Sequence, residues 1–143
     1  MGKGRDLVER GIDMLNRGAM DELVSTYTED AVEVFPGTEY KGREAISERL
    51  REQQDAFPDR HIRPLRWVEE GDTVVVEYEF TATHTGPFRL PDGTVLAPTG
   101  QHVSFPCVSI FEARGEKCAR HTGYFDMAPL MMQLGVLMPK SSA

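Results

Sequence analysis

The chain has 143 residues, of which 40% are hydrophobic and 27% charged, so a disordered protein is not indicated and one domain over residues 1–143 is expected. Its net charge of −7 disfavours binding to nucleic acid and to anionic membrane surfaces. The sequence holds no apolar run of bilayer length, and residues 1–6 (MGKGRD) lack the apolar stretch of a signal peptide, so a cytoplasmic protein is expected.

Helices are predicted in the first part of the chain. Apolar side chains recur at helical spacing over residues 4–16. Asp21 is a favoured N-cap residue, which predicts a second, short helix over 21–27. A strand over 31–35 and a third helix over 43–56 follow.

Most of the remaining chain is predicted to be sheet. Residues 61–69 and 73–84 form a hairpin across Gly71, and the second of these segments alternates apolar with polar side chains. Residues 86–100 form a loop rich in proline and glycine, and loops of this length often serve as lids. Helices first and antiparallel strands afterwards predict an α+β fold.

A last hairpin, formed by strands over 102–112 and 117–125, precedes a helix over 127–134. A short turn would pair Ser109 with His121 on the more apolar face, which should point inward. The sequence therefore predicts that His121 enters a cavity beside Ser109.

His121 is the leading candidate for a catalytic acid–base group. A histidine titrates near physiological pH, which suits proton transfer. A structural histidine that is hydrogen-bonded to Ser109 is the alternative with equal weight, because buried polar groups usually find a partner whatever their role.

His84 and Asp126 are weaker catalytic candidates. His84 ends the apolar face of its strand and could line the mouth of the cavity, although a role in anchoring the long loop through a backbone carbonyl is slightly favoured and the two roles can coexist. Asp126 directly precedes the last helix, so an N-cap role is favoured over that of a base.

Aromatic walls are expected to bury a flat organic ligand. The residues expected to contact the substrate are Trp67, Tyr78, Phe80, Phe88, Phe105, Ser109 and Phe125.

No metal or organic cofactor is expected. The sequence contains no glycine-rich phosphate loop, no His-Glu-x-x-His helix and no Gly-x-Ser-x-Gly elbow. Its four histidines do not have metal-ligand spacing, and Cys107 and Cys118 do not form a Cys-x-x-Cys pair.

Short segments along nearly the whole chain resemble the SnoaL-like polyketide cyclases of the nuclear transport factor two-like superfamily. These segments are 27–32 (YTEDAV), 42–46 (GREAI), 56–59 (AFPD), 83–86 (THTG), 98–100 (PTG), 124–126 (YFD) and 133–135 (QLG).

The resemblance implies a cone-shaped α+β barrel, in which a curved antiparallel sheet wraps on N-terminal helices around a deep pocket. It also implies a homodimer packed through the sheet, with Val75, Val108 and Ile110 as outward candidates. The known cyclases close rings by intramolecular aldol condensation without a metal or organic cofactor.

The chain departs from these cyclases at the residues that carry their chemistry. The cyclase positions occupied by a histidine and an aspartate fall here at Ser109 and Gly123, and neither can act as a general base near neutral pH. The cyclase mechanism therefore does not transfer residue by residue.

The expected function is cofactor-independent acid–base cyclisation or isomerisation of a polyketide-like or other small apolar natural product. A non-catalytic ligand-binding protein of the same fold is the first alternative. An epoxide hydrolase ranks lower, because the inward faces of the last strands carry no carboxylate.

Overall fold

The computed structural model describes residues 2–136. Its helices are α1 (Lys3–Arg17), α2 (Met20–Ser25), α3 (Arg43–Ala56) and α4 (Met127–Leu134). Its strands are β1 (Tyr27–Phe35), β2 (Thr38–Lys41), β3 (His61–Glu70), β4 (Thr73–Thr83), β5 (Phe88–Arg89), β6 (Val95–Leu96), β7 (His102–Arg114) and β8 (Lys117–Phe125).

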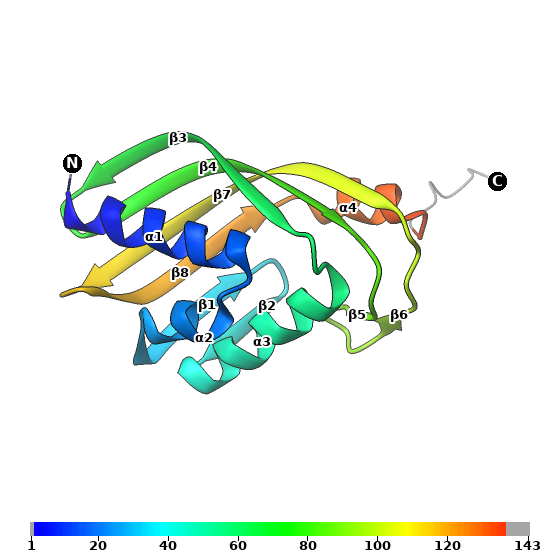
Figure 1. The fold of residues 1–143 in the computed structure, drawn as a ribbon, viewed down its shortest axis with the longest axis horizontal. Helices are drawn as coiled ribbons and strands as arrows, with labels where there is room; N and C mark the ends of the chain where they lie inside the picture. Colours follow the sequence, from blue (N-terminus) through cyan, green and yellow to red (C-terminus); the bar gives the residue numbers. More distant parts are fainter. Residues whose placement is uncertain (1, 137–143) are drawn as a thin grey trace.

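The main structural feature is a curved sheet with the strand order β2-β1-β8-β7-β4-β3. Helices α1, α2 and α3 lie together on one side of it, and α4 packs against the beginning of β7 (Figure 1). Strands β2 and β3 are the two edges and do not pair with each other, so the sheet stays open. This arrangement confirms the predicted α+β fold of a curved sheet on N-terminal helices.

The sheet is mixed, whereas the sequence predicts an antiparallel one. Strands β1 and β8 pair in parallel, while the other neighbouring pairs of the sheet are antiparallel. Strand β1 lies between β2, which follows it directly and runs antiparallel to it, and the last strand β8, which runs in the same direction as β1. The short strand β2, which extends the sheet beyond β1, was not predicted.

Two helices have the predicted bounds, and one begins differently. Both α3 and α4 cover the predicted residues, and Gly135 ends α4 with a left-handed backbone at φ 78°. Helix α2 begins at Met20 without a side-chain N-cap, so Asp21 lies in its first turn and does not cap it. The helix ends at Ser25, and β1 begins at Tyr27, which was predicted to end the helix, and not at Ala31.

The register of the last hairpin differs from the prediction by two residues. Ser109 pairs with Gly123, and His121 pairs with Phe111. One residue of the shift comes from a turn tighter than predicted, which pairs Arg114 with Lys117, and the other from a bulge between Glu112 and Ala113. Since side chains alternate with a period of two, this shift leaves His121 and Ser109 on the predicted inward face.

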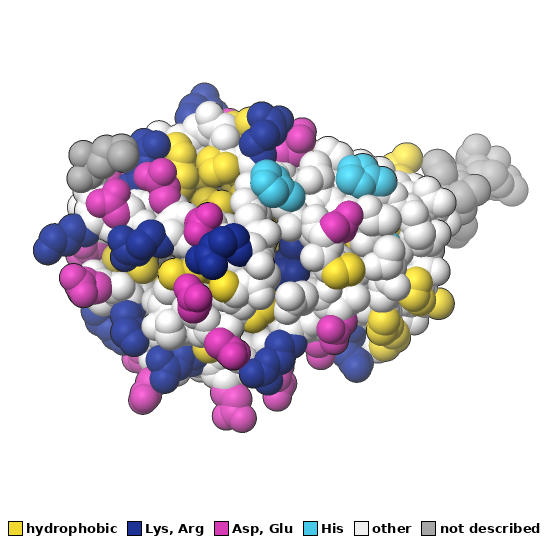
Figure 2. All heavy atoms as spheres, viewed as in Figure 1, with side chains coloured by type: hydrophobic (Ala, Val, Ile, Leu, Met, Phe, Trp, Pro, Cys, Tyr) yellow, Lys and Arg dark blue, Asp and Glu magenta, His cyan; other side chains and the backbone are white. Residues whose placement is uncertain are grey.

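The core has two parts. One part packs β4 and β7 against α4, and the other packs β1 and β8 against α1, α2 and α3; Phe111 contacts both. Acidic and basic side chains are mixed over the helical face of the molecule (Figure 2). Within residues 2–136, the helices are too short or too polar to cross a membrane.

Candidate active site

A buried carboxylate, Glu33, stands at the centre of a polar cluster inside the fold. Glu33 lies on β1 and pairs with His121 on β8, so both side chains project from neighbouring positions on the concave face. Glu33 is fully buried, and His121 is 8% exposed. The Glu33 Oε2 atom lies 2.9 Å from Nδ1 of His121.

Arg49 of α3 and Tyr27 of β1 hold the Glu33 carboxylate in place. Arg49 donates from Nε to Oε1 at 2.6 Å and from Nη2 to Oε2 at 3.1 Å, and the Tyr27 hydroxyl donates to Oε2 at 2.8 Å. Burial alone would raise the pKa of the Glu33 carboxyl, but the Arg49 charge and the His121 hydrogen bond outweigh it and lower that pKa to about 2. Glu33 is therefore ionised in the folded protein.

The ionised Glu33 fixes how the protons of a neutral His121 are arranged. A carboxylate can only accept, so Nδ1 of His121 carries the hydrogen and donates it to Glu33. Nε2 of His121 then has a free lone pair, and it lies 2.9 Å from Oγ of Ser109. The Ser109 hydroxyl therefore donates to His121.

The chain of hydrogen bonds continues from Ser109 to Tyr78. The Tyr78 hydroxyl lies 2.9 Å from Oγ of Ser109, and since the serine hydrogen points to His121, Tyr78 donates to Ser109. Tyr78 on β4 lies diagonally across from Ser109 on β7, which lies diagonally across from His121. The polar chain thus crosses four strands of the concave face, from β4 to β1.

Two cavities adjoin this polar chain. The larger, of about 340 Å³, opens between β2, α3 and the β5–β6 segment, and its walls include Phe35, Tyr40 and Phe88. The smaller, of about 70 Å³, lies between α1, α2 and the sheet. Its walls consist mostly of apolar side chains, together with those of Tyr27, Tyr78 and His121. Arg49 lines both cavities.

The residues predicted to contact a ligand separate into three groups. Phe88 and Phe125 line the larger cavity, and Tyr78 lines the smaller. Ser109 is fully buried and lies within the hydrogen-bond chain. The residues predicted as pocket walls that line neither cavity are Trp67, Phe80 and Phe105.

The three exceptions have a common physical cause. Phe80 and Phe105 pack against each other in the β4–β7 core, with 5.2 Å between ring centroids and a tilt of 34° between the rings, and neighbouring aromatic rings cover them. Trp67 packs against α1, with the Arg5 guanidinium 4.7 Å from its ring centroid. An inward-facing aromatic side chain therefore fills core volume here and does not bound the open space.

His84 is fully buried and anchors the end of the long loop. Its Nδ1 accepts the backbone N–H of Thr99 at 3.2 Å and lies 2.9 Å from the Thr99 hydroxyl. These contacts agree with the predicted role as a loop anchor, although the partner of Nδ1 is Thr99 and not a backbone carbonyl. His84 lines neither cavity. The loop itself contains the β5–β6 ribbon, beside the end of α3 (Figure 1).

Asp126 is exposed and has the geometry of an N-cap. Its Oδ1 accepts the backbone N–H of Ala128 at 2.9 Å, at the first turn of α4. It does not contact His121 or line either cavity.

The cap makes a testable difference between two substitutions. Asp126→Ala should lower the free energy of unfolding by about 0.5–2 kcal/mol, because it removes the acceptor for Ala128. Asp126→Asn should be nearly neutral, because its amide oxygen accepts the same bond. Urea denaturation measures both effects, and an Asn variant that is as unstable as the Ala variant would contradict a pure capping role.

Gly123 is required by a close approach of the Phe35 ring. A Cβ atom at position 123 would lie 2.5 Å from Cε1 of Phe35, well inside van der Waals contact. Phe35 also packs edge-on against His121, with 5.1 Å between the ring centroids. The ring of Phe35 therefore separates Gly123 and His121 from the larger cavity, whose wall it forms.

Sequence reasoning found His121, Ser109 and Tyr78 but missed Glu33, Arg49 and Tyr27. The available signal was the alternation Ala31, Glu33, Phe35, which puts a carboxylate on one face of β1 together with apolar side chains. The competing face, with Val32 and Val34, is more apolar and conceals this signal.

Comparison with known proteins gives one family. The profile of the SnoaL-like domain matches residues 8–121. A comparison with curated protein sequences finds no match.

Several solved structures have the same fold. AclR of Streptomyces galilaeus, a candidate hydroxylase, is 25% identical with a TM-score of 0.80, over 94% of this chain and 97% of its own. A candidate SnoaL-like polyketide cyclase of Jannaschia sp. CCS1 is 23% identical with a TM-score of 0.83, over 96% and 94%. A candidate polyketide cyclase of Xanthomonas campestris is 23% identical with a TM-score of 0.81, over 92% and 96%.

Proposed function

Because the chain belongs to the SnoaL-like domain family, we propose that it cyclises or isomerises a polyketide-like or other small apolar natural product by acid–base catalysis. In this proposal no metal or organic cofactor takes part. His121 supplies the acid–base function, and Glu33 orients its ring and stabilises the charged imidazolium.

One observation carries the proposal: a histidine beside a cavity is hydrogen-bonded at 2.9 Å to a buried carboxylate that stays ionised. Such a carboxylate sets the tautomer of the neutral ring, with hydrogen on Nδ1 and a lone pair on Nε2. Cyclisation and isomerisation at a carbonyl compound both need one proton removed and one returned, which a single imidazole can do.

Glu33 itself is unsuited to be the base. Its two oxygens already accept hydrogen bonds from Arg49, Tyr27 and His121, and its low pKa makes it a weak proton acceptor. The sequence-based argument against an epoxide hydrolase was that the inward faces of the last strands carry no carboxylate. Glu33 of β1 supplies an interior carboxylate, so that argument no longer holds. That alternative still ranks lower, because Glu33 has little capacity left to activate a water molecule.

A non-catalytic ligand-binding protein is the second candidate. The observation that favours it is that both ring nitrogens of His121 already have protein partners, Glu33 and Ser109. In such a protein the same polar chain would serve only to fix the shape of the smaller cavity.

Deuterium incorporation into a panel of test compounds distinguishes the two candidates. The protein is incubated in D2O with apolar ketones and poly-β-carbonyl compounds, and mass spectrometry follows deuterium at the α-carbons and any cyclised product. A catalyst exchanges these protons and depends on His121. Saturable binding without exchange would favour the ligand-binding protein.

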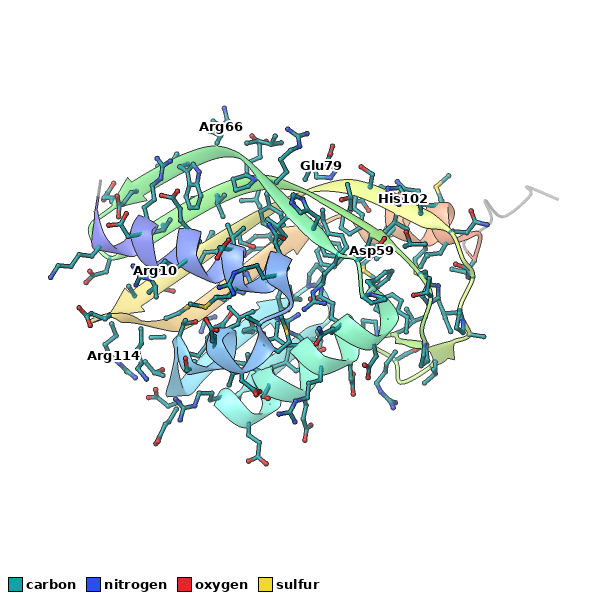
Figure 3. All side chains as sticks on the ribbon, in the orientation of Figure 1. Arg10, Asp59, Arg66, Glu79, His102 and Arg114 are labelled. Atoms are coloured by element: carbon teal, nitrogen blue, oxygen red, sulfur yellow. The ribbon has the colours of Figure 1, made fainter. Side chains whose placement is uncertain are left out.

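We further propose that two copies of the chain pair through the outer face of the sheet. Val68, Val75 and Ile110 occupy adjacent strands in one row across that face, and Val68 is 59% exposed. The labelled side chains of Arg66 and Glu79 project from the same outer side (Figure 3). A row of this kind is a candidate for burial by a partner.

Light scattering at micromolar concentration should therefore give twice the chain mass of 16.1 kDa. Ile110→Lys should shift the population to monomer, because it would place a charge in the middle of the buried row. Ser25→Lys adds the same charge at an exposed position of α2, on the helical side of the sheet, and should leave the dimer intact. A wild-type protein of chain mass alone would contradict the proposed pairing.

A further inference from the structure

His121 has no free ring nitrogen to offer a ligand. Nδ1 is held by Glu33 and Nε2 by Ser109, each at 2.9 Å. One face of the ring stacks on Phe111, at 4.2 Å between centroids, and its edge meets Phe35. The smaller cavity, of about 70 Å³, has room only for the reacting end of a ligand, and that end reaches the imidazole only if one of these hydrogen bonds breaks.

Tyr78 lines the same cavity and does have free acceptor capacity. Its hydroxyl donates one hydrogen bond, to Ser109, and its oxygen can still accept. Ser109 is fully buried and lies between Tyr78 and His121, with 2.9 Å on both sides. An unbroken path for a proton thus runs from the cavity wall to Nε2 of His121.

We propose that Tyr78 is the side chain that exchanges a proton with the ligand, and that Ser109 relays this proton to and from His121. The relay rests on the acid–base function proposed above, and it assigns the contact with the substrate to Tyr78. In that role Tyr78 is a catalytic residue, whereas Ser109 and Glu33 are positioning residues.

The step balances in protons and charge. A ligand C–H bond breaks and its proton binds Oη of Tyr78, while the electron pair stays on the ligand as an enolate. The hydrogen of Tyr78 passes to Oγ of Ser109, and the hydrogen of Ser109 passes to Nε2 of His121. His121 becomes an imidazolium, paired with the Glu33 carboxylate.

The return step uses the same path with every hydrogen bond reversed. The imidazolium donates from Nε2 to Ser109, Ser109 donates to Tyr78, and Tyr78 donates into the cavity at an oxygen or carbon of the ligand. Burial raises the pKa of the Tyr78 phenol above its usual value, so Tyr78 does not ionise alone. It accepts a proton only as it passes its own proton on.

The first experiment is made on the free protein and needs no ligand. NMR of the protein with 15N-labelled histidine identifies which ring nitrogen of neutral His121 carries hydrogen. The relay requires hydrogen on Nδ1 and a bare Nε2. Hydrogen on Nε2 would overturn the relay and leave the proposed function standing.

The second experiment measures deuterium incorporation by five proteins: the wild type, Tyr78→Phe, Ser109→Ala, Ser109→Thr and the exposed control Tyr124→Phe. Tyr78→Phe and Ser109→Ala should each lose about 10²-fold or more in rate, the scale of a positioned acid or base. Ser109→Thr keeps the hydroxyl and should restore most of the rate, which a merely structural role of Ser109 would not require.

Two outcomes separate the relay from the proposed function. If Tyr78→Phe exchanges at the wild-type rate while His121→Gln is inactive, His121 acts directly on the ligand and the relay is wrong. If the wild type exchanges no ligand proton at all, the proposed acid–base function fails and the relay fails with it.

Discussion

Glu33→Ala is expected to lower the free energy of unfolding by about 3–5 kcal/mol, the cost of breaking a buried ion pair by removal of one partner. The substitution leaves the Arg49 guanidinium, whose side chain is 14% exposed, without its carboxylate. Tyr27 and His121 lose an acceptor at the same time. Urea denaturation of the variant and the wild type measures the difference.

Two controls isolate the buried charge. Glu79→Ala removes one partner of the exposed pair with Arg63 and should cost less than about 1 kcal/mol. The double variant Glu33→Gln with Arg49→Met removes both charges and should recover much of the loss, because no unpaired charge remains. A Glu33→Ala variant no less stable than Glu79→Ala would show that the pair contributes little.

The same pair predicts a pH dependence of stability. The pKa of Glu33 is lowered in the folded protein from 4.5 to about 2. As the pH falls, Glu33 therefore takes up its proton in the unfolded chain before it does so in the folded protein. The stabilisation is therefore complete above about 4.5 and declines as the pH falls toward 2. The difference in stability between the wild type and Glu33→Ala should shrink over this interval.

His121→Gln is expected to lower the rate of deuterium incorporation by about 10²–10⁴-fold, the usual contribution of general acid–base catalysis. Glutamine can hydrogen-bond to Ser109 or Glu33 but cannot take up a proton, so the loss reports on chemistry more than on packing. The rate is measured on whichever ketone of the panel the wild type exchanges fastest.

A second histidine provides the matched control. His61 is exposed on β3 and lines neither cavity, so His61→Gln should exchange at the wild-type rate. Thermal melting of both variants checks that they fold. A folded His121→Gln variant with the full rate would remove His121 from the proposed mechanism.

The fold was predictable to the extent that local signals fix it. The bounds of α3 and α4 could be predicted because a helical pattern in one case and a capping aspartate with a terminal glycine in the other mark them directly. The position of β8 beside β1 was not predictable in this way. It depends on contacts between residues about 90 positions apart, which no local pattern encodes.

Only part of the candidate site, His121 with Ser109, could be predicted from the sequence. The inward direction of His121 and Ser109 follows from the alternation of their strands and does not change with a two-residue shift of register. Glu33 could not be found because Val32 and Val34 make the opposite face of β1 the more apolar one. On the outer face of the sheet, Val34 lies beside Thr122, which in turn lies beside Ile110. Val32 and Val34 are half-buried on that face.

The aromatic residues expose another limit of reasoning from pattern. Alternation predicts that Phe80 and Phe105 point inward, and both are buried. Whether an inward side chain bounds a cavity or fills the core depends on its neighbours from other strands and helices. For these two rings, Phe57 and Phe125 supply the neighbours.

The contact between Phe35 and Gly123 constrains the order in which substitutions at these two positions can accumulate. The resemblance to polyketide cyclases assigns position 123 to their aspartate, yet even a Cβ atom there would overlap Phe35. A large ring at position 35 can take its present position only where position 123 carries no side chain. A carboxylate can return only after the ring has left, so the two substitutions are contingent on each other. As long as the ring keeps its present position, the route between an aspartate at 123 and the site proposed around His121 runs through an intermediate with both positions small, in which the floor of the larger cavity would extend to His121.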